Sequence, residues 1–266
     1  MRRVHSWLRA RRGVARLTSL AMLLTAWWVV VPLVDTNVVP TLGEVAVFMW
    51  DEIRMDTLAP ATLYQSFATT LGRLAIGLSA ALVVGMTVGL LMGLSTRVHL
   101  ALEHFVVVGL SVPSLVYALI TAMWFGFGST GPILTAFMAS VAFITMSTAE
   151  GVKNVPTDLL EMATAFNIRR STAIRDIVLP SLLPFLFAAI RFGVASGWRG
   201  LVIAEIFASA SGAGWMVMYW YDARRVQGVV GYAMFFLLFA LLLDVIFDKV
   251  SAHVFRWRPA LGARAA

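Results

Sequence analysis

Six long apolar runs, each close to the length of a bilayer crossing, constrain the fold of this chain more than any other feature. A helix needs roughly 20 mostly apolar residues to cross the hydrocarbon core of a membrane. The runs predict an all-α integral membrane protein with about six transmembrane helices. Pro113 interrupts the third run, and a kinked span inside a helix bundle tolerates a proline. The runs are Leu17–Val34, Ala68–Leu94, Phe105–Phe125, Ile133–Ala149, Leu182–Ala204 and Val229–Val250.

Composition supports a membrane protein and excludes several other classes. The chain is 60% hydrophobic and only 13% charged, whereas soluble domains are about a quarter charged. It has no cysteine, which excludes disulfide scaffolds, thiol nucleophiles and zinc–thiolate sites. In a soluble protein the net charge of +7 would suggest a nucleic-acid partner. Here basic residues that flank membrane spans explain the charge, and we expect no nucleic acid.

The basic residues are distributed unevenly over the segments between the runs. If both termini are cytoplasmic, 15 of the 21 Lys and Arg residues fall in cytoplasmic segments and three in outer loops. Basic residues gather on the cytoplasmic side of membrane proteins. We therefore predict cytoplasmic N- and C-termini and a retained first span. The segments are a basic N-terminus (1–16), the first transmembrane helix (17–35), an outer segment (36–63), a transmembrane domain (64–250) and a C-terminal tail (251–266).

Two of the segments outside the spans have the composition of a membrane surface. Thr41–Asp56 alternates apolar and acidic residues in the manner of an amphipathic helix lying on the outer surface. Ser211–Tyr221 is rich in Trp and Tyr, which favour the interface between lipid and water. We expect both segments, and membrane lipid around the spans.

The longest polar interruption between spans is Glu161–Pro180. Asp158 is expected to cap a helix that starts at Leu159, with Glu161 at its third position as in a capping box. Asn167 is expected to stop that helix, because Asn tolerates the left-handed conformation found after a helix C-terminus.

A second short helix is expected to follow that turn. Ser171 can cap it and Pro180 is expected to end it. The resulting hairpin carries apolar Met162, Phe166 and Ile168 beside basic residues. A polar loop without a partner would not need exposed Met and Phe, so the hairpin indicates a docking element for a cytoplasmic partner.

At these residues the chain resembles inner-membrane permeases of binding-protein-dependent ABC importers, in the nitrate, sulfonate and taurine branch. The signature loop of that family reads Glu-Ala-Ala, a Gly four residues later, then Ile-x-Leu-Pro after nine more. Matching positions are Glu161, Ala163, Ile177, Leu179 and Pro180, while Met162 and Asn167 replace Ala and Gly. The segments VPTLGEV, WFGFG and GWRGLVIAE extend the resemblance over roughly residues 40–257.

The resemblance implies a type I ABC importer transmembrane fold in the bacterial inner membrane. The hairpin, within a coupling loop at 151–181, would dock on a cytoplasmic ABC ATPase dimer, with a periplasmic solute-binding protein above and a second permease subunit, in a homodimer, beside it. The residues implied in coupling are Glu161, Ala163, Phe166, Asn167, Ile177, Leu179 and Pro180. The expected solute is first a sulfonate such as taurine, then nitrate or bicarbonate, and after these a thiamine precursor or an aromatic compound.

The chain lacks the sequence of a nucleotide site. No G-x-x-x-x-G-K-[ST] motif occurs, and no H-E-x-x-H zinc motif either. We therefore expect a transport subunit, not an enzyme, with no cofactor, metal or catalytic residue of its own. ATP would be used by the partner subunit.

Among the charged residues in or directly beside the predicted spans, the candidates for the translocation path are Arg73, Arg199 and Glu205. Arg73 and Glu205 lie at similar depth, so a structural ion pair between their helices is the alternative for these two. Arg199 lining a path for an anion is the sharper hypothesis, because six residues separate it from Glu205 and put the two on different helix faces.

The second span also carries Gly85, Gly89 and Gly93 at intervals of four residues. Small residues at this spacing let two helix backbones approach closely. We call these three glycines the glycine seam, and it would serve either a dimer contact or packing within one subunit.

Two other functional classes are alternatives to an importer. An ion-coupled secondary transporter often has inverted repeats and midplane carboxylates, and Glu205 is the one deep acid. A membrane-embedded enzyme would need an intramembrane nucleophile or metal cluster. Uptake after collapse of the proton gradient, with ATP preserved, separates importer from secondary transporter.

Overall fold

The computed structural model describes residues 39–255 together with Thr18, Met22, Thr25, Trp27 and Val29. Both terminal segments, 1–16 and 256–266, lie outside the described residues. The predicted first span, Leu17–Val34, also lies outside them except for the five residues named above. The helices are α2 (Leu42–Arg54), α3 (Leu63–Leu94), α4 (Thr96–Ser111), α5 (Ser114–Phe125), α6 (Thr130–Lys153), α7 (Thr157–Ala165), α8 (Arg170–Ala173), η2 (Ile174–Val178), α9 (Leu179–Ala208), α10 (Ala213–Asp222) and α11 (Val226–Val254).

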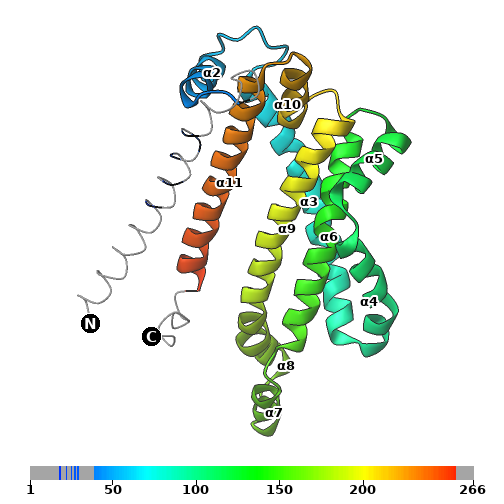
Figure 1. The fold of residues 1–266 in the computed structure, drawn as a ribbon. Coiled ribbons are helices and arrows are strands. Elements are labelled where there is room, and N and C mark those ends of the chain that lie inside the picture. Colours follow the sequence, from blue (N-terminus) through cyan, green and yellow to red (C-terminus); the bar gives the residue numbers. More distant parts are fainter. Residues whose placement is uncertain are drawn as a thin grey trace, which may run out of the picture.

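Four of these helical segments are long and apolar enough to cross a membrane. They are Leu63–Leu94, Thr130–Lys153, Ser171–Ala208 and Val226–Val254. Figure 1 shows α3, α6 and α9 running side by side through the molecule, with α11 along one flank. The α2 and α10 helices lie at one end of this bundle, and α7 projects from the other.

The third predicted span differs from a simple kinked helix. It consists of α4 and α5, which meet at an angle of 94° around Pro113. Proline supplies no N–H for the helix ladder and drives the residue before it out of the helical region. Val112 accordingly has ψ 124°, and the chain turns there instead of bending gently.

Small residues let α3, α6 and α9 pack closely. Ala81, Ile144 and Ala189 form one buried cluster between these helices, and Leu74, Ala136 and Leu201 belong to another. Ser140 donates to the Gly193 carbonyl at 2.9 Å, and Ser196 donates to the Ala139 carbonyl at 2.7 Å. Close backbone approach and interhelical hydrogen bonds are the forces that hold helices together in lipid.

The glycine seam of α3 faces α6 of the same chain. A Cβ added at Gly85 would lie 2.8 Å from Ile144, and one at Gly93 would lie 2.4 Å from Val152. At Gly89 it would lie 2.6 Å from the Thr145 carbonyl oxygen, which is backbone and cannot swing away. The geometry of this seam is that of close packing between two helices of one subunit.

We therefore expect Gly89→Ala to destabilise the chain by about 1–3 kcal/mol, the usual penalty of overpacking. The matched control is Gly72→Ala in the same helix, where an added Cβ meets nothing within 4 Å. That control should be neutral or slightly stabilising, because alanine is the better helix former. Thermal unfolding in detergent measures both, and an equal response of the two variants would contradict the packing account.

The hairpin and its junction to α9 depart from the predicted boundaries. Helix α7 begins at Thr157, after Pro156, so Asp158 lies in the first turn and no capping box forms with Glu161. Pro156 has φ −62° and no N–H to satisfy, which lets the helix start directly after it. Ser171 lies inside α8, which begins at Arg170, and does not cap it.

Pro180 does not end the second helix, as the sequence suggested it would. The chain passes from α8 through the π-helical turn η2 into α9 without a break. The wider turn closes with a hydrogen bond from the Leu179 N–H to the Ile174 carbonyl, five residues back. A π turn before a proline loosens the helix where the ring would otherwise clash with the preceding turn.

Candidate functional site

The end of α7 forms a tight turn centred on Asn167. Asn167 has φ 52°, in the left-handed region that its sequence position predicted. The Ile168 N–H donates to the Ala163 carbonyl at 2.9 Å, and the Asn167 N–H donates to the Thr164 carbonyl at 3.0 Å. These two bonds define a Schellman cap, which is a stiff way to end a helix.

This turn presents apolar side chains that are exposed in the part of the chain that the structure describes. Phe166 is 74% exposed, Met162 48% and Ile168 40%. Ala163 is buried and Glu161 is exposed. We call Met162, Phe166 and Ile168 the α7 apolar face. It lies at the end of the molecule opposite α2 and α10 (Figure 1).

The hairpin is continuous with two helices of the bundle. It follows α6 after Lys153 and leads into α9 through η2, and α6 and α9 pack closely on each other. Ile177 and Pro180 are partly buried at this junction, whereas Leu179 is exposed. The remaining predicted coupling residues therefore lie in the connection to α9 and not on the apolar face itself. A displacement of the hairpin would pass directly into α9.

Arg73 and Glu205 form a buried ion pair at the end of the bundle that carries α10, the cross-helix pair that the sequence offered as the alternative for these two. Arg73 Nη1 lies 2.7 Å from Glu205 Oε1, and the side chains are 4% and 0% exposed. Thr70 Oγ1 and the Gly214 N–H donate to Glu205 Oε2 at 2.7 and 3.0 Å. Because every oxygen of Glu205 is bonded within the chain, the pair is part of the packing and offers no free charge to a solute.

The pair connects segments far apart in the sequence. Arg73 in α3 also donates to Ser129, Ser209 and Ser211, which precede α6 and follow α9. The Gly212 backbone, at φ 106°, passes so close to the carboxylate that an added Cβ would lie 2.2 Å from Glu205 Oε1. The similar depth of Arg73 and Glu205 in the sequence indicated the pair, whereas its serine partners lie in loops without a motif.

Arg199 lies apart from that pair. Its side chain is exposed and lines an open cavity of about 300 Å³ beside the α4–α5 bend. Its one hydrogen bond within the described part of the chain runs from Nε to the Ala195 carbonyl of its own helix, at 3.1 Å. The third arginine inside the spans, Arg191, pairs instead with Asp244 and Asp248 of α11.

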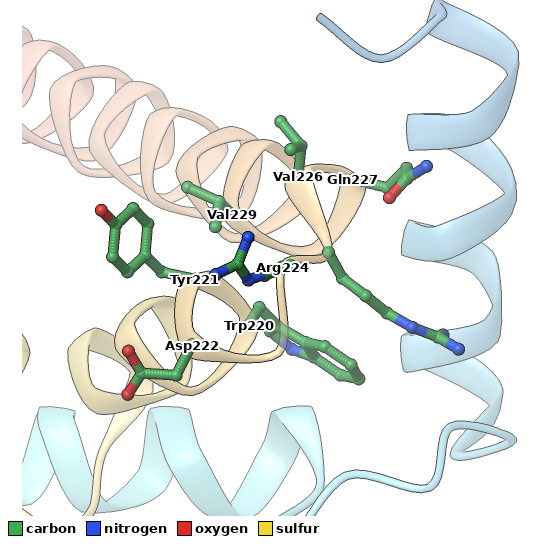
Figure 2. A pocket seen from close by; sticks show the side chains of 8 residues that line it. Trp220, Tyr221, Asp222, Arg224, Val226, Gln227 and Val229 are labelled. Atoms are coloured by element: carbon green, nitrogen blue, oxygen red, sulfur yellow. The ribbon is translucent and has the colours of Figure 1, made fainter. Parts of the chain in front are cut away.

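At the end of the bundle that carries α2 and α10, a larger hollow of about 870 Å³ lies between α10 and the start of α11. We call it the outer hollow, after the orientation that the sequence predicts. Figure 2 shows Tyr221, Asp222 and Arg224 around it, with Trp220 beneath and the α2 helix alongside. Behind it, Phe48 of α2 packs edge-on against Trp220 at 5.2 Å between ring centroids. These contacts hold α2 on the bundle.

Glu52 of α2 is buried beside Tyr232 of α11, which the sequence did not indicate. Tyr232 donates to Glu52 Oε2 at 3.2 Å. Burial raises the pKa of the Glu52 carboxyl above its ordinary value of 4.5, and hydrogen bonds from Thr57 and Tyr232 offset part of that rise. The folded protein thus holds the proton on the Glu52 carboxyl more tightly than the unfolded chain does. Ionisation of Glu52 at neutral pH therefore lowers the free energy of unfolding, and acidification raises it again.

Glu52→Gln is therefore expected to raise the melting temperature at pH 7.5, and this advantage should shrink as the pH falls toward 4.5. Melting curves of both proteins at several pH values measure the difference, with exposed Asp56→Asn as the control. An advantage that stays constant over this range would contradict the burial account.

Among the described residues no group of three or more His, Asp or Glu side chains is placed to hold a metal ion. The features that stand out are therefore the α7 apolar face, the Arg199 cavity and the outer hollow.

Comparison with known proteins gives a consistent picture. Residues 81–256 match the family model described as binding-protein-dependent transport system inner membrane component. The chain is 30% identical over 253 residues to the taurine transport system permease protein TauC of Escherichia coli (strain K12), covering 94% of this chain and 92% of the relative. It is 26% identical over 192 residues to the nitrate import permease protein NrtB of Leptolyngbya laminosa, covering 72% and 69%.

A solved structure shares the fold. The inward-facing MetNI methionine ABC transporter contains a chain that aligns with a TM-score of 0.63 at 17% identity, covering 72% of this chain and 95% of that one. At this identity the likeness concerns the fold alone.

Proposed function

Because the chain belongs to the family of binding-protein-dependent transport system inner membrane components and resembles a taurine and a nitrate permease, we propose that its solute is a small anion such as a sulfonate or nitrate. Members of this family are the permease subunits of ABC importers. The protein is a multi-pass protein of the bacterial inner membrane. We further propose that a separate ATPase drives it by docking on the α7 apolar face, and that the chain contributes no nucleotide site.

The exposed turn at Phe166 is the observation that carries the docking proposal. A side chain of this size that is 74% exposed at the tip of a hairpin gains nothing for folding. Aromatic residues with flanking basic residues are typical anchors of protein interfaces. The Schellman cap at Asn167 fixes the turn, so little ordering entropy is lost on docking.

The mechanism follows from the connection between the hairpin and the bundle. Closure of an ATPase dimer would displace both hairpins of a permease dimer toward each other. Since η2 joins the hairpin to α9 without a break, the displacement would pass into α9 and its partner α6. The helices would then open the path alternately to the two sides of the membrane.

The remaining partners follow from the two ends of the molecule. With the α7 end in the cytoplasm, α2, α10 and the outer hollow face the periplasm, where a solute-binding protein would deliver the anion. A second copy of the chain would complete the path, and both N- and C-termini would be cytoplasmic.

The energy source and the class of solute can be tested together. Cells expressing the chain with its ATPase and binding protein are given labelled taurine, nitrate and bicarbonate separately. We expect uptake of one of these anions that persists under a protonophore while ATP is preserved and stops when ATP is depleted. Uptake that stops under the protonophore at preserved ATP would contradict the importer mechanism. Uptake of a neutral solute and of none of the anions would contradict the anion proposal.

A further inference from the structure

Arg199 is the arginine inside the described spans whose charge no carboxylate of the described chain neutralises. Arg73 pairs with Glu205, and Arg191 pairs with two aspartates. Within residues 39–255, the side chain of Arg199 forms one hydrogen bond, from Nε to its own helix, and both terminal nitrogens of the guanidinium have no partner there. None of the described residues that line its cavity carries a carboxylate.

The depth of Arg199 makes this free charge costly. It lies nine residues before the end of α9 at Ala208, or about 13 Å along the helix axis. Arginines near helix ends reach the interface with their long side chains, but a residue this deep must meet water, a counter-charge or another polar group. A retained charge in such a place therefore indicates a function beyond packing.

The wall opposite Arg199 is formed by the broken span. The cavity of about 300 Å³ lies where α4 gives way to α5, and Ser114 at the start of α5 lines it together with Tyr117. Pro113 caps α5 without a side-chain hydrogen bond, so the first N–H groups of the helix are not capped by a side chain. The positive end of this helix adds to the charge of Arg199.

The other polar groups of the cavity hold its shape. Ser196 donates to the Ala139 carbonyl, and Tyr117 donates to the Gly109 carbonyl at 3.0 Å. These bonds tie α9 to α6 and α5 to α4 around the cavity. Phe143 supplies an apolar wall. A volume of this size accommodates a compact solute rather than a peptide or a lipid tail.

We propose that the Arg199 cavity is the point in the translocation path at which the permease binds the anionic head of its solute, a compact oxyanion with one negative charge. The guanidinium binds the oxyanion through charge-assisted hydrogen bonds, and the Ser114 end of α5 stabilises its negative charge. The proposal rests on the proposed function, since it assigns a site within that path. It makes the permease itself, and not the binding protein alone, selective for charge.

The test compares Arg199→Gln, Arg199→Lys and the control Arg97→Gln, an exposed arginine at the start of α4. Uptake kinetics are measured for whichever of taurine, nitrate or bicarbonate the wild type imports. For Arg199→Gln we expect kcat/KM for uptake to fall roughly 10- to 100-fold, the loss of one or more charge-assisted hydrogen bonds. Arg199→Lys, which keeps the charge, should recover part of that loss, and Arg97→Gln should match wild type.

Association with the ATPase and the second permease copy is measured on the same variants by size-exclusion chromatography. Unchanged assembly with reduced uptake supports the site. Unchanged assembly with unchanged uptake overturns it and leaves the importer intact. Loss of the second copy in Arg199→Gln also overturns it, because Arg199 would then pair across a dimer contact. Absence of ATP-dependent uptake in the wild type would count against the proposed function itself.

Discussion

Arg73→Met is expected to destabilise the folded chain by about 3–5 kcal/mol, the usual result of removing one partner of a buried ion pair. Glu205 would keep its carboxylate fully buried, with Thr70 and Gly214 as its remaining donors and no counter-charge. Ser129 and Ser211 would lose their common partner at the same time. The melting temperature in detergent should fall by on the order of 10 °C.

The double variant Arg73→Met with Glu205→Gln separates the charge from the packing. It removes both charges and keeps side chains of similar length, so it should be more stable than Arg73→Met alone. Exposed Arg97→Met is the matched control and should melt like wild type. If the double variant melts below Arg73→Met, the buried charge is not the source of the loss.

Phe166→Asp is expected to abolish capture of the ATPase without altering the fold. The side chain is 74% exposed, so its replacement removes little buried area, whereas loss of an aromatic anchor at an interface costs about 2–4 kcal/mol. The complex should therefore weaken roughly 30- to 1,000-fold. A pull-down of the tagged chain from its native membranes in mild detergent, with mass spectrometry of the recovered proteins, measures the effect.

Leu58→Asp is the control for this substitution. Leu58 is 99% exposed in the loop between α2 and α3, at the other end of the molecule. This variant should recover the ATPase as well as wild type does. If Phe166→Asp recovers as much ATPase as wild type does, the α7 apolar face is not the docking surface for the ATPase.

The long spans could be predicted from sequence because membrane thickness alone sets their length. Pro113 identified the weak point of the third span, but no local rule gives the angle of 94° at which α4 and α5 meet. That angle depends on how α5 packs against α6 and α9. The same bend brings Ser114 and Tyr117 to Arg199, so the full cavity could not be predicted either.

Local chemistry was a good guide where one residue decides the backbone. Asn167 adopts the left-handed conformation that its amide side chain tolerates. Local chemistry mispredicted the helix boundaries where two tendencies compete. At Asp158 the expected cap does not form, because the helix already starts after Pro156. At Pro180 the expected helix end does not occur, because a π turn accommodates the proline ring. Glu52 gave no signal because its burial depends on Phe48 and Tyr232, and Tyr232 lies 180 residues away.

The most direct test of coupling uses the absence of cysteine from the chain. Ala165→Cys and Leu58→Cys each introduce a single thiol, and Ala165 is an exposed position next to Phe166 that leaves the aromatic anchor in place. A thiol-specific cross-linker is applied to sealed membranes that contain the ATPase. We predict that the thiol at position 165 cross-links to the ATPase and reacts with an impermeant maleimide only from the cytoplasmic side. The thiol at position 58 should react only from the outside and form no cross-link. Labelling of both thiols from the same side, or no ATPase cross-link at position 165, would contradict the account.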